Sequence, residues 1–144
     1  MAFTLSKRNL VVGVSVAVAL TAGLAGCATN PMDAAACTAF VTAQSTYDDV
    51  ANTALKDNNP VNSALWTAAW KALPTAITGA AKLANGEALK KAFTAYDEVL
   101  ASNANAAEAK RLEIWQAGYA QGVVSVCVST GNAKADDLTP INVP

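Results

Sequence analysis

Three cysteines and the absence of histidine limit the chemistry that this sequence can perform. The chain of 144 residues contains no His, which removes the usual general base of hydrolases and the commonest metal ligand. A Ser-His-Asp triad, a Cys-His dyad, a His-ligated zinc or haem site and a di-iron helical bundle are therefore excluded. The three cysteines are Cys27, Cys37 and Cys127, and their roles have to be ones that need no imidazole.

Paired carboxylates offer another route to catalysis, because a glycosidase needs an acid on each side of the scissile bond. Three adjacent pairs occur: Asp48-Asp49, Asp97-Glu98 and Asp136-Asp137. Neighbouring residues on a helix do not face each other, so we interpret the first two pairs as solvated helix surface and the third as part of a mobile tail. The segment 57–60 has one acid only, too few for a calcium loop. We expect neither an enzyme nor a metal site.

The amino-terminal stretch has the layout of a secretory leader. Lys7 and Arg8 precede eighteen uncharged residues, Leu10 to Cys27, a length that would also suit an uncleaved transmembrane helix. The last four residues favour a leader. Leu24-Ala25-Gly26-Cys27 resembles the lipobox of bacterial lipoproteins, in which an aliphatic residue and two small residues precede the Cys that becomes the new amino terminus.

This resemblance implies that Cys27 receives a thioether-linked diacylglyceryl group, that the chain is cut after Gly26, and that the freed amine is acylated, for example with palmitate. A thiol is the soft nucleophile that alkylation needs. Two or more acyl chains hold a protein durably on a membrane. We therefore expect an exported protein on the outer face of the cell membrane, or in the periplasm or outer membrane of a Gram-negative host, with no cofactor besides the lipid.

The predicted cleavage divides the chain into four parts. They are a signal peptide (1–26), the lipidated Cys with a short tether (27–30), a helical bundle (31–131) and a flexible tail (132–144). The 118 mature residues suit one compact domain. The formal charge is −1, and the loss of Lys7 and Arg8 with the leader makes it −3, so we expect no nucleic-acid partner.

The mature sequence is rich in Ala and lacks strand-like alternation, which predicts an all-α, up-down four-helix bundle. Asn30 and Pro31 are typical of a helix start, and the first helix is expected to end at 57–60. The second begins at Asn59-Pro60 or Asn62-Ser63 and ends at Asn85-Gly86. Inside it, Pro74 predicts a kink or a break, since proline removes a backbone hydrogen bond.

The second half of the bundle is predicted to contain a helix from Glu87 to about Ser102 and a fourth helix. Residues 105–108 have the form of a capping box for that fourth helix, and Gly131 is placed to end it. Gly118 and Gly122 on it predict a tight internal crossing. The expected core faces, interrupted at Gln44, are Cys37, Phe40, Val41, Tyr47, Ala51, Ala54 and Leu55; Trp66, Ala69, Trp70, Leu73, Ile77 and Ala81; Leu89, Phe93, Tyr96 and Leu100; and Leu112, Trp115, Tyr119, Val123 and Val126.

Cys37 and Cys127 are expected to form a disulfide, because an even pair in an exported protein meets an oxidising compartment. Cys37 follows the start of the first helix and Cys127 precedes the end of the fourth, and these ends meet in an up-down bundle of four helices but not of three. A free redox-active pair is the alternative, although no C-x-x-C motif is present. Two residues separate Cys27 from Asn30, so the disulfide end should face the membrane.

Trp66, Trp70 and Trp115 could pack in the core, line a hydrophobic ligand cavity or contact a partner; the first two share a helical stripe with Leu73 and Ile77, which favours the core. We expect a non-catalytic, envelope-associated interaction module with an envelope protein as partner. The alternatives are a small-ligand or lipid-binding bundle opened at the Pro74 kink, and a phage- or prophage-encoded lipoprotein that acts in superinfection exclusion. The Ala-rich helical region, with a Cys near each end, also resembles small exported actinobacterial proteins of unknown function.

Overall fold

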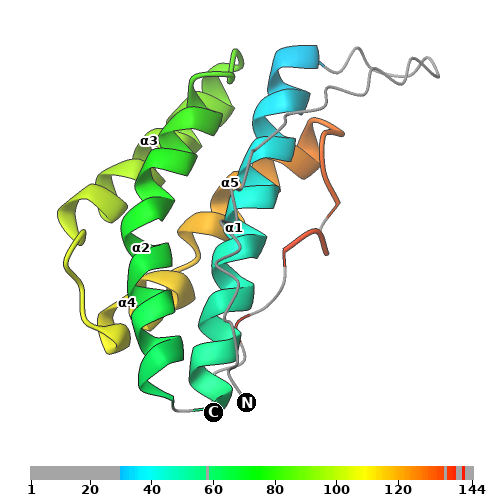
Figure 1. Ribbon diagram of the computed structural model, residues 1–144. Coiled ribbons are helices and arrows are strands. Elements are labelled where there is room, and N and C mark those ends of the chain that lie inside the picture. Colours follow the sequence, from blue (N-terminus) through cyan, green and yellow to red (C-terminus); the bar gives the residue numbers. More distant parts are fainter. Residues whose placement is uncertain (1–29, 58, 135, 139–140, 142–144) are drawn as a thin grey trace, which may run out of the picture.

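The computed structural model describes residues 30–57, 59–134, 136–138 and 141. In these ranges the chain forms five helices and no strand (Figure 1): α1 Pro31–Asp57, α2 Pro60–Ala81, α3 Glu87–Ser102, α4 Glu108–Gln116 and α5 Tyr119–Ser129. The predicted all-α bundle is confirmed. Helices α4 and α5 together take the place of the predicted fourth helix. The predicted leader, with Gly26 and Cys27, lies outside the described residues. None of the described helices is long and apolar enough to cross a membrane.

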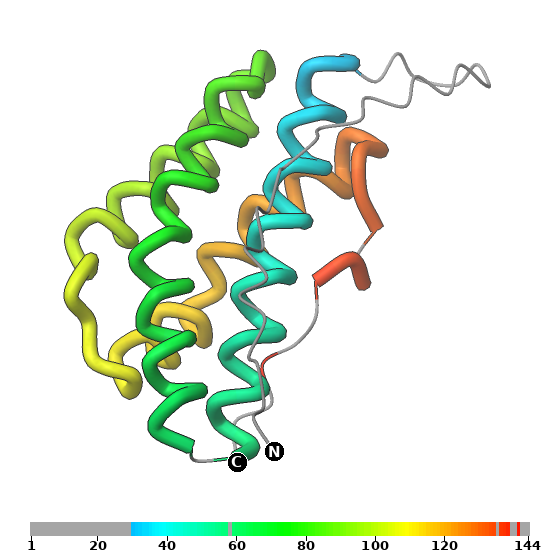
Figure 2. Tube along the Cα trace, in the orientation of Figure 1, coloured from blue at the N-terminus to red at the C-terminus, as the bar shows by residue number. Residues whose placement is uncertain are grey.

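Two Asn-Pro pairs start the first two helices as predicted. The Asn30 Oδ1 accepts a hydrogen bond from the backbone N–H of Met32 at 3.0 Å, and the Asn59 Oδ1 accepts one from that of Val61 at 2.9 Å. Each side chain satisfies one of the N–H groups that a helix start leaves unpaired. The two helices form the long antiparallel pair that runs the length of the bundle (Figure 2).

Helix α2 runs through Pro74 without a break. Trp70, Leu73 and Ile77 flank the proline in sequence and are all buried. Their packing secures the helix on both sides of the missing hydrogen bond, at a site where proline alone would favour a break. The helix ends at Ala81, earlier than the Asn85-Gly86 pair that we expected to end it.

The fourth helix differs from its prediction at its start and in its middle. Its first helical residue is Glu108, the Ala107 cap has no side-chain bond, and the expected capping box is absent. The Glu108 carboxylate instead accepts a hydrogen bond from the Ser63 hydroxyl on α2. Gly118 has φ of 79°, the left-handed conformation that glycine adopts most readily, and it separates α4 from α5. The Ser63–Glu108 hydrogen bond therefore replaces the predicted capping box, and the turn at Gly118 interrupts the predicted continuous helix.

The break at Gly118 also changes which residues of this segment are buried. Tyr119, predicted to face the core, is 38% exposed. Gly122 is exposed and a Cβ atom there would meet no other atom within 4 Å, so the predicted tight crossing at this glycine is wrong. The residues of α4 and α5 that are buried are Arg111, Ile114, Ala120, Val123, Val124 and Cys127.

The core lies between the helices, and its large side chains come mainly from the predicted stripes of α1, α2 and α3. Phe40 on α1 makes edge-to-face contacts with Phe93 and Tyr96 on α3, at ring-centre distances of 5.7 and 6.3 Å. Part of the predicted tail also packs on the bundle. Ile141 is 4% exposed, and the Ser45 hydroxyl donates a hydrogen bond to the Asp137 carbonyl.

Candidate functional site

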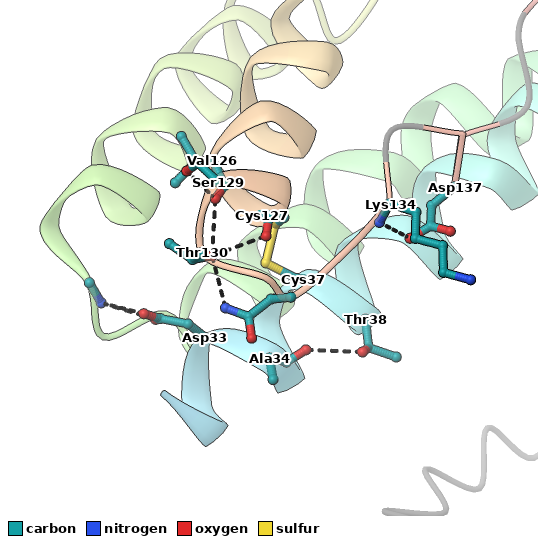
Figure 3. Close-up of a disulfide and its surroundings, with 12 residues drawn as sticks. Asp33, Ala34, Cys37, Thr38, Val126, Cys127, Ser129, Thr130, Lys134 and Asp137 are labelled. Atoms are coloured by element: carbon teal, nitrogen blue, oxygen red, sulfur yellow. Dashed lines mark hydrogen bonds between the residues drawn. A yellow bond between two sulfur atoms is a disulfide. The ribbon is translucent and has the colours of Figure 1, made fainter. Parts of the chain in front are cut away.

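One end of the bundle is closed covalently by the Cys37–Cys127 disulfide, which confirms the predicted pairing (Figure 3). The Cα atoms are 5.8 Å apart, and 90 positions separate the two residues in the sequence. The bond joins the second turn of α1 to the last turns of α5, so the first and last helices begin and finish at the same end. We call this end, with the start of α1, the α2–α3 loop and the finish of α5, the disulfide end.

Asp33 fastens the α2–α3 loop to the same end of the bundle. Its carboxylate is almost fully buried and accepts hydrogen bonds from the backbone N–H groups of Asn85 at 2.6 Å and Gly86 at 3.0 Å (Figure 3). A Cβ atom at Gly86 would lie 2.8 Å from the Asp33 Oδ2, so this approach requires glycine. Asp33 is an acid in the first turn of α1, and neither its residue type nor its position in the sequence signals the contact with the loop.

A buried polar cluster of Gln44, Asp48 and Tyr96 joins α1 to α3 in the middle of the core. The Gln44 Nε2 donates to the Asp48 Oδ1 at 2.8 Å, and the Tyr96 hydroxyl donates to the Gln44 Oε1 at 2.8 Å. Asp48 is 0% exposed, so its prediction as solvated surface is wrong, whereas its neighbour Asp49 is exposed. Gln44 and Asp48 are four residues apart on the core stripe of α1, a spacing that could have indicated their burial.

Burial raises the pKa of Asp48 from its ordinary value of 3.8 to about 7. The hydrogen bond from Gln44 lowers this pKa and the nearby charge of Asp49 raises it, but desolvation is the largest cause. The Asp48 Oδ2 has no hydrogen-bond partner among the described residues. Burial also raises the pKa of Tyr47 to about 12. With a pKa of about 7, the buried Asp48 carboxyl group changes its protonation state near neutral pH.

Trp66 and Trp70 are core residues, as the helical stripe predicted. The Trp66 Nε1 donates to the Tyr47 hydroxyl at 2.9 Å, and the Trp70 Nε1 donates to the Asn103 carbonyl at 2.9 Å. The Arg111 guanidinium lies over both rings, 5.5 and 5.9 Å from their centres. The two hydrogen bonds pair both indole N–H groups within the protein.

The third tryptophan and the buried arginine depart from the sequence analysis in different ways. Trp115 is half-buried against the core, and its Nε1 has no hydrogen-bond partner among the described residues. Arg111 is buried, and it donates to the Ala106 carbonyl at 2.8 Å and to the Thr67 hydroxyl at 3.2 Å. The sequence analysis missed Arg111 because it took Leu112 and Trp115 as the inner face of a continuous helix.

Among the hollows on the surface of the described residues are two open ones that no tryptophan lines. The larger, of about 380 Å³, is lined by Ala81, Lys82, Ala84, Lys90, Phe93, Thr94 and Asp97. The smaller, of about 340 Å³, is lined by Val99, Asn103, Lys110, Glu113, Ile114, Ala117 and Tyr119. Asp97 accepts hydrogen bonds from the Thr78 hydroxyl and is half-buried, whereas we had expected it to face solvent freely.

No known protein family matches the chain, and neither a curated protein nor a solved structure shows significant similarity to it. Within the described residues, Cys, Asp and Glu side chains form no group of three or more that could hold a metal ion. The fold brings together four groups of residues. They are the paired cysteines, Asp33 with the backbone of the α2–α3 loop, the polar cluster around Asp48, and Arg111 with Trp66 and Trp70.

Proposed function

We propose that this protein is an exported lipoprotein anchored to a membrane through a lipid on Cys27, and that its bundle is a non-catalytic interaction module of the cell envelope. The observation that carries the proposal is the Leu24-Ala25-Gly26-Cys27 sequence, placed directly after a charged start and a long uncharged stretch. The Cys37–Cys127 disulfide supports export, because such bonds persist in oxidising compartments.

The environment of Asp48 supports a non-catalytic role. Burial moves the pKa of Asp48 toward neutrality, as a general acid or base would need. Its side chain is completely buried and hydrogen-bonded to Gln44, so no substrate reaches it in this conformation. Trp66 and Trp70 similarly use their indole N–H groups within the core, which favours an interaction module over a tryptophan-lined ligand cavity.

Mass spectrometry of the amino-terminal peptide tests the anchor. We expect the mature chain to begin at Cys27 with a diacylglyceryl mass and to sediment with membranes. Cys27→Ser should keep its leader and carry no lipid, while the double variant Cys37→Ser/Cys127→Ser should still be lipidated, because it lacks only the disulfide. An unmodified Cys27 in the wild-type protein, or a Cys27→Ser variant of unchanged size and membrane retention, would refute the anchor.

Crosslinking in intact cells tests the interaction role. The module predicts one envelope protein that crosslinks to the wild-type chain and is lost with Cys27→Ser, since that variant is mislocalised. Recovery of no specific protein would contradict the module and favour the small-ligand alternative.

A further inference from the structure

Three large apolar side chains are exposed at the disulfide end. One is Val128, in the last turn of α5, which is 37% exposed. The other two belong to the segments that Asp33 fastens together. Met32, in the first turn of α1, is 52% exposed, and Leu83, in the α2–α3 loop, is 40% exposed. The bonds from Asn85 and Gly86 to Asp33 hold the two segments together. Figure 1 shows the start of α1 and the α2–α3 loop at the same end of the molecule. We call Met32 and Leu83 the apolar tip.

The charges around the apolar tip suit an anionic surface. Lys82 is exposed and precedes Leu83 in the chain. It lines the larger surface hollow together with Lys90 and the half-buried Asp97, whose carboxylate accepts a hydrogen bond from the Thr78 hydroxyl. The acid nearest to Met32 in sequence, Asp33, is buried with its carboxylate occupied by backbone N–H groups, so its charge is directed inward. Glu87, the other acid of this loop region, forms an ion pair with Lys90 at 3.7 Å.

The position of the predicted anchor decides which surface the apolar tip meets. Two residues separate Cys27 from Asn30, so the three steps from one Cα atom to the next span at most about 10 Å when the chain is fully extended. Asn30 caps α1 directly before the turn that carries Met32. A lipid on Cys27 therefore holds the bilayer within reach of the tip, whereas exposed apolar residues at the other end of α2, such as Leu65, lie far from it.

We propose that the apolar tip docks on the phospholipid bilayer, with Met32 and Leu83 at the level of the headgroups and Lys82 beside their phosphates. The inference rests on the lipid anchor proposed above. Apolar side chains gain free energy on entering the interface, and lysine is attracted to anionic lipids. The bundle then stands on its disulfide end, and the turn between α1 and α2 faces away from the membrane.

Photocrosslinking from single positions tests this docking. The full lipidated chain carries benzoylphenylalanine in place of Leu83 or, as the matched control, Leu65, which is 57% exposed on α2. Each protein is reconstituted into vesicles of phosphatidylethanolamine and phosphatidylglycerol and irradiated. We expect at least a tenfold higher yield of lipid adducts from position 83 than from position 65. Equal yields, or no adduct from position 83, would overturn the inference.

Two variants that reverse the charge of a lysine give a second readout. In this test the crosslinking residue replaces neither Met32 nor Leu83, so the apolar tip stays intact. With benzoylphenylalanine at position 85, which is exposed in the α2–α3 loop, Lys82→Glu should lower the adduct yield several-fold, and Lys71→Glu, at an exposed position in the middle of α2, should leave it unchanged. An equal effect of both variants would overturn the role of Lys82. The mass of the Cys27 peptide from each sample separates the two proposals: a lipidated peptide without adducts refutes the docking alone, and an unlipidated peptide refutes the anchor and the docking together.

Discussion

Replacing Asp48 by Asn tests whether a buried carboxyl group makes this bundle less stable as the pH rises. Asn has the shape of a protonated Asp and keeps an oxygen that can accept the hydrogen bond from the Gln44 amide. It cannot ionise, so it removes the pH dependence with little change in packing. The exposed neighbour Asp49 provides the matched control, Asp49→Asn.

The sign and the size of the effect follow from the pKa of Asp48. In the folded chain this pKa is about 7, above the ordinary value of 3.8, so the folded state binds the proton more tightly than the unfolded state. The contribution of Asp48 to the free energy of unfolding is then highest below about pH 4 and falls as the pH rises to about 7, above which the loss is complete. The gap between the two pKa values corresponds to a loss of about 4 kcal/mol.

Denaturant unfolding followed by tryptophan fluorescence measures this loss, because Trp66 and Trp70 are buried in the folded state. The protein used begins at Ala28, which retains all the described core residues, and its disulfide is kept oxidised. We expect wild type and Asp48→Asn to have similar free energies of unfolding near pH 3, below the unfolded-state pKa of Asp48. At pH 8.5 the variant should be more stable by about 4 kcal/mol, and Asp49→Asn should follow the wild type.

A constant difference between Asp48→Asn and the wild type at every pH would refute the reasoning, since it would show that Asp48 does not take up a proton within this range. The reasoning would be refuted more strongly if the wild type had the higher free energy of unfolding and its advantage over Asp48→Asn grew with pH. That result would mean that the ionised carboxylate is the form that the core stabilises.

Three other tests, each with its own substitutions, probe separate contacts. Cys37→Ala/Cys127→Ala should lower the free energy of unfolding by about 4–5 kcal/mol, measured with denaturant, because the disulfide closes a long loop in the unfolded chain; an unchanged midpoint would contradict this. Gly118→Ala should cost about 1–2 kcal/mol because φ is positive there, while Gly122→Ala, at an open helical site, should gain about 0.5–1 kcal/mol; thermal unfolding showing the same sign for both would be inconsistent with the break between α4 and α5. Arg111→Met should destabilise the fold by about 1–3 kcal/mol and change the tryptophan emission spectrum, since it removes a cation from two rings; an unaltered spectrum would show that the guanidinium does not lie over them.

The parts of the fold that the sequence predicted well depend on local signals. The caps at Asn30 and Asn59 are formed by bonds between residues two positions apart, so the sequence contains both partners. The disulfide is a long-range contact, yet it followed from the helix count and the compartment together. Tryptophan and leucine at helical spacing on α2 identified its buried face correctly.

The features that the sequence did not reveal are those in which a polar residue has its partner on another helix or loop. Asp33 and Gly86 are 53 positions apart, and neither residue type alone indicates the other. Asp48 looked like a surface acid because Asp49 follows it, and only the burial of Gln44 and Tyr96 around it explains its place in the core. The break at Gly118 replaced a continuous amphipathic stripe by two short ones, which moved Arg111 inward.

The Cys37–Cys127 bond also determines what becomes of the chain when a protease cuts it. All connections between successive helices, from the α1–α2 turn to the break at Gly118, lie between the two cysteines. A single cut in any of them yields two fragments that remain joined through sulfur. The carboxy-terminal fragment, with Cys127, therefore stays bonded to the amino-terminal fragment, with Cys37. Electrophoresis shows two fragments only after reduction. Damage to one loop would thus leave all five described helices in one molecule for as long as the disulfide stays oxidised.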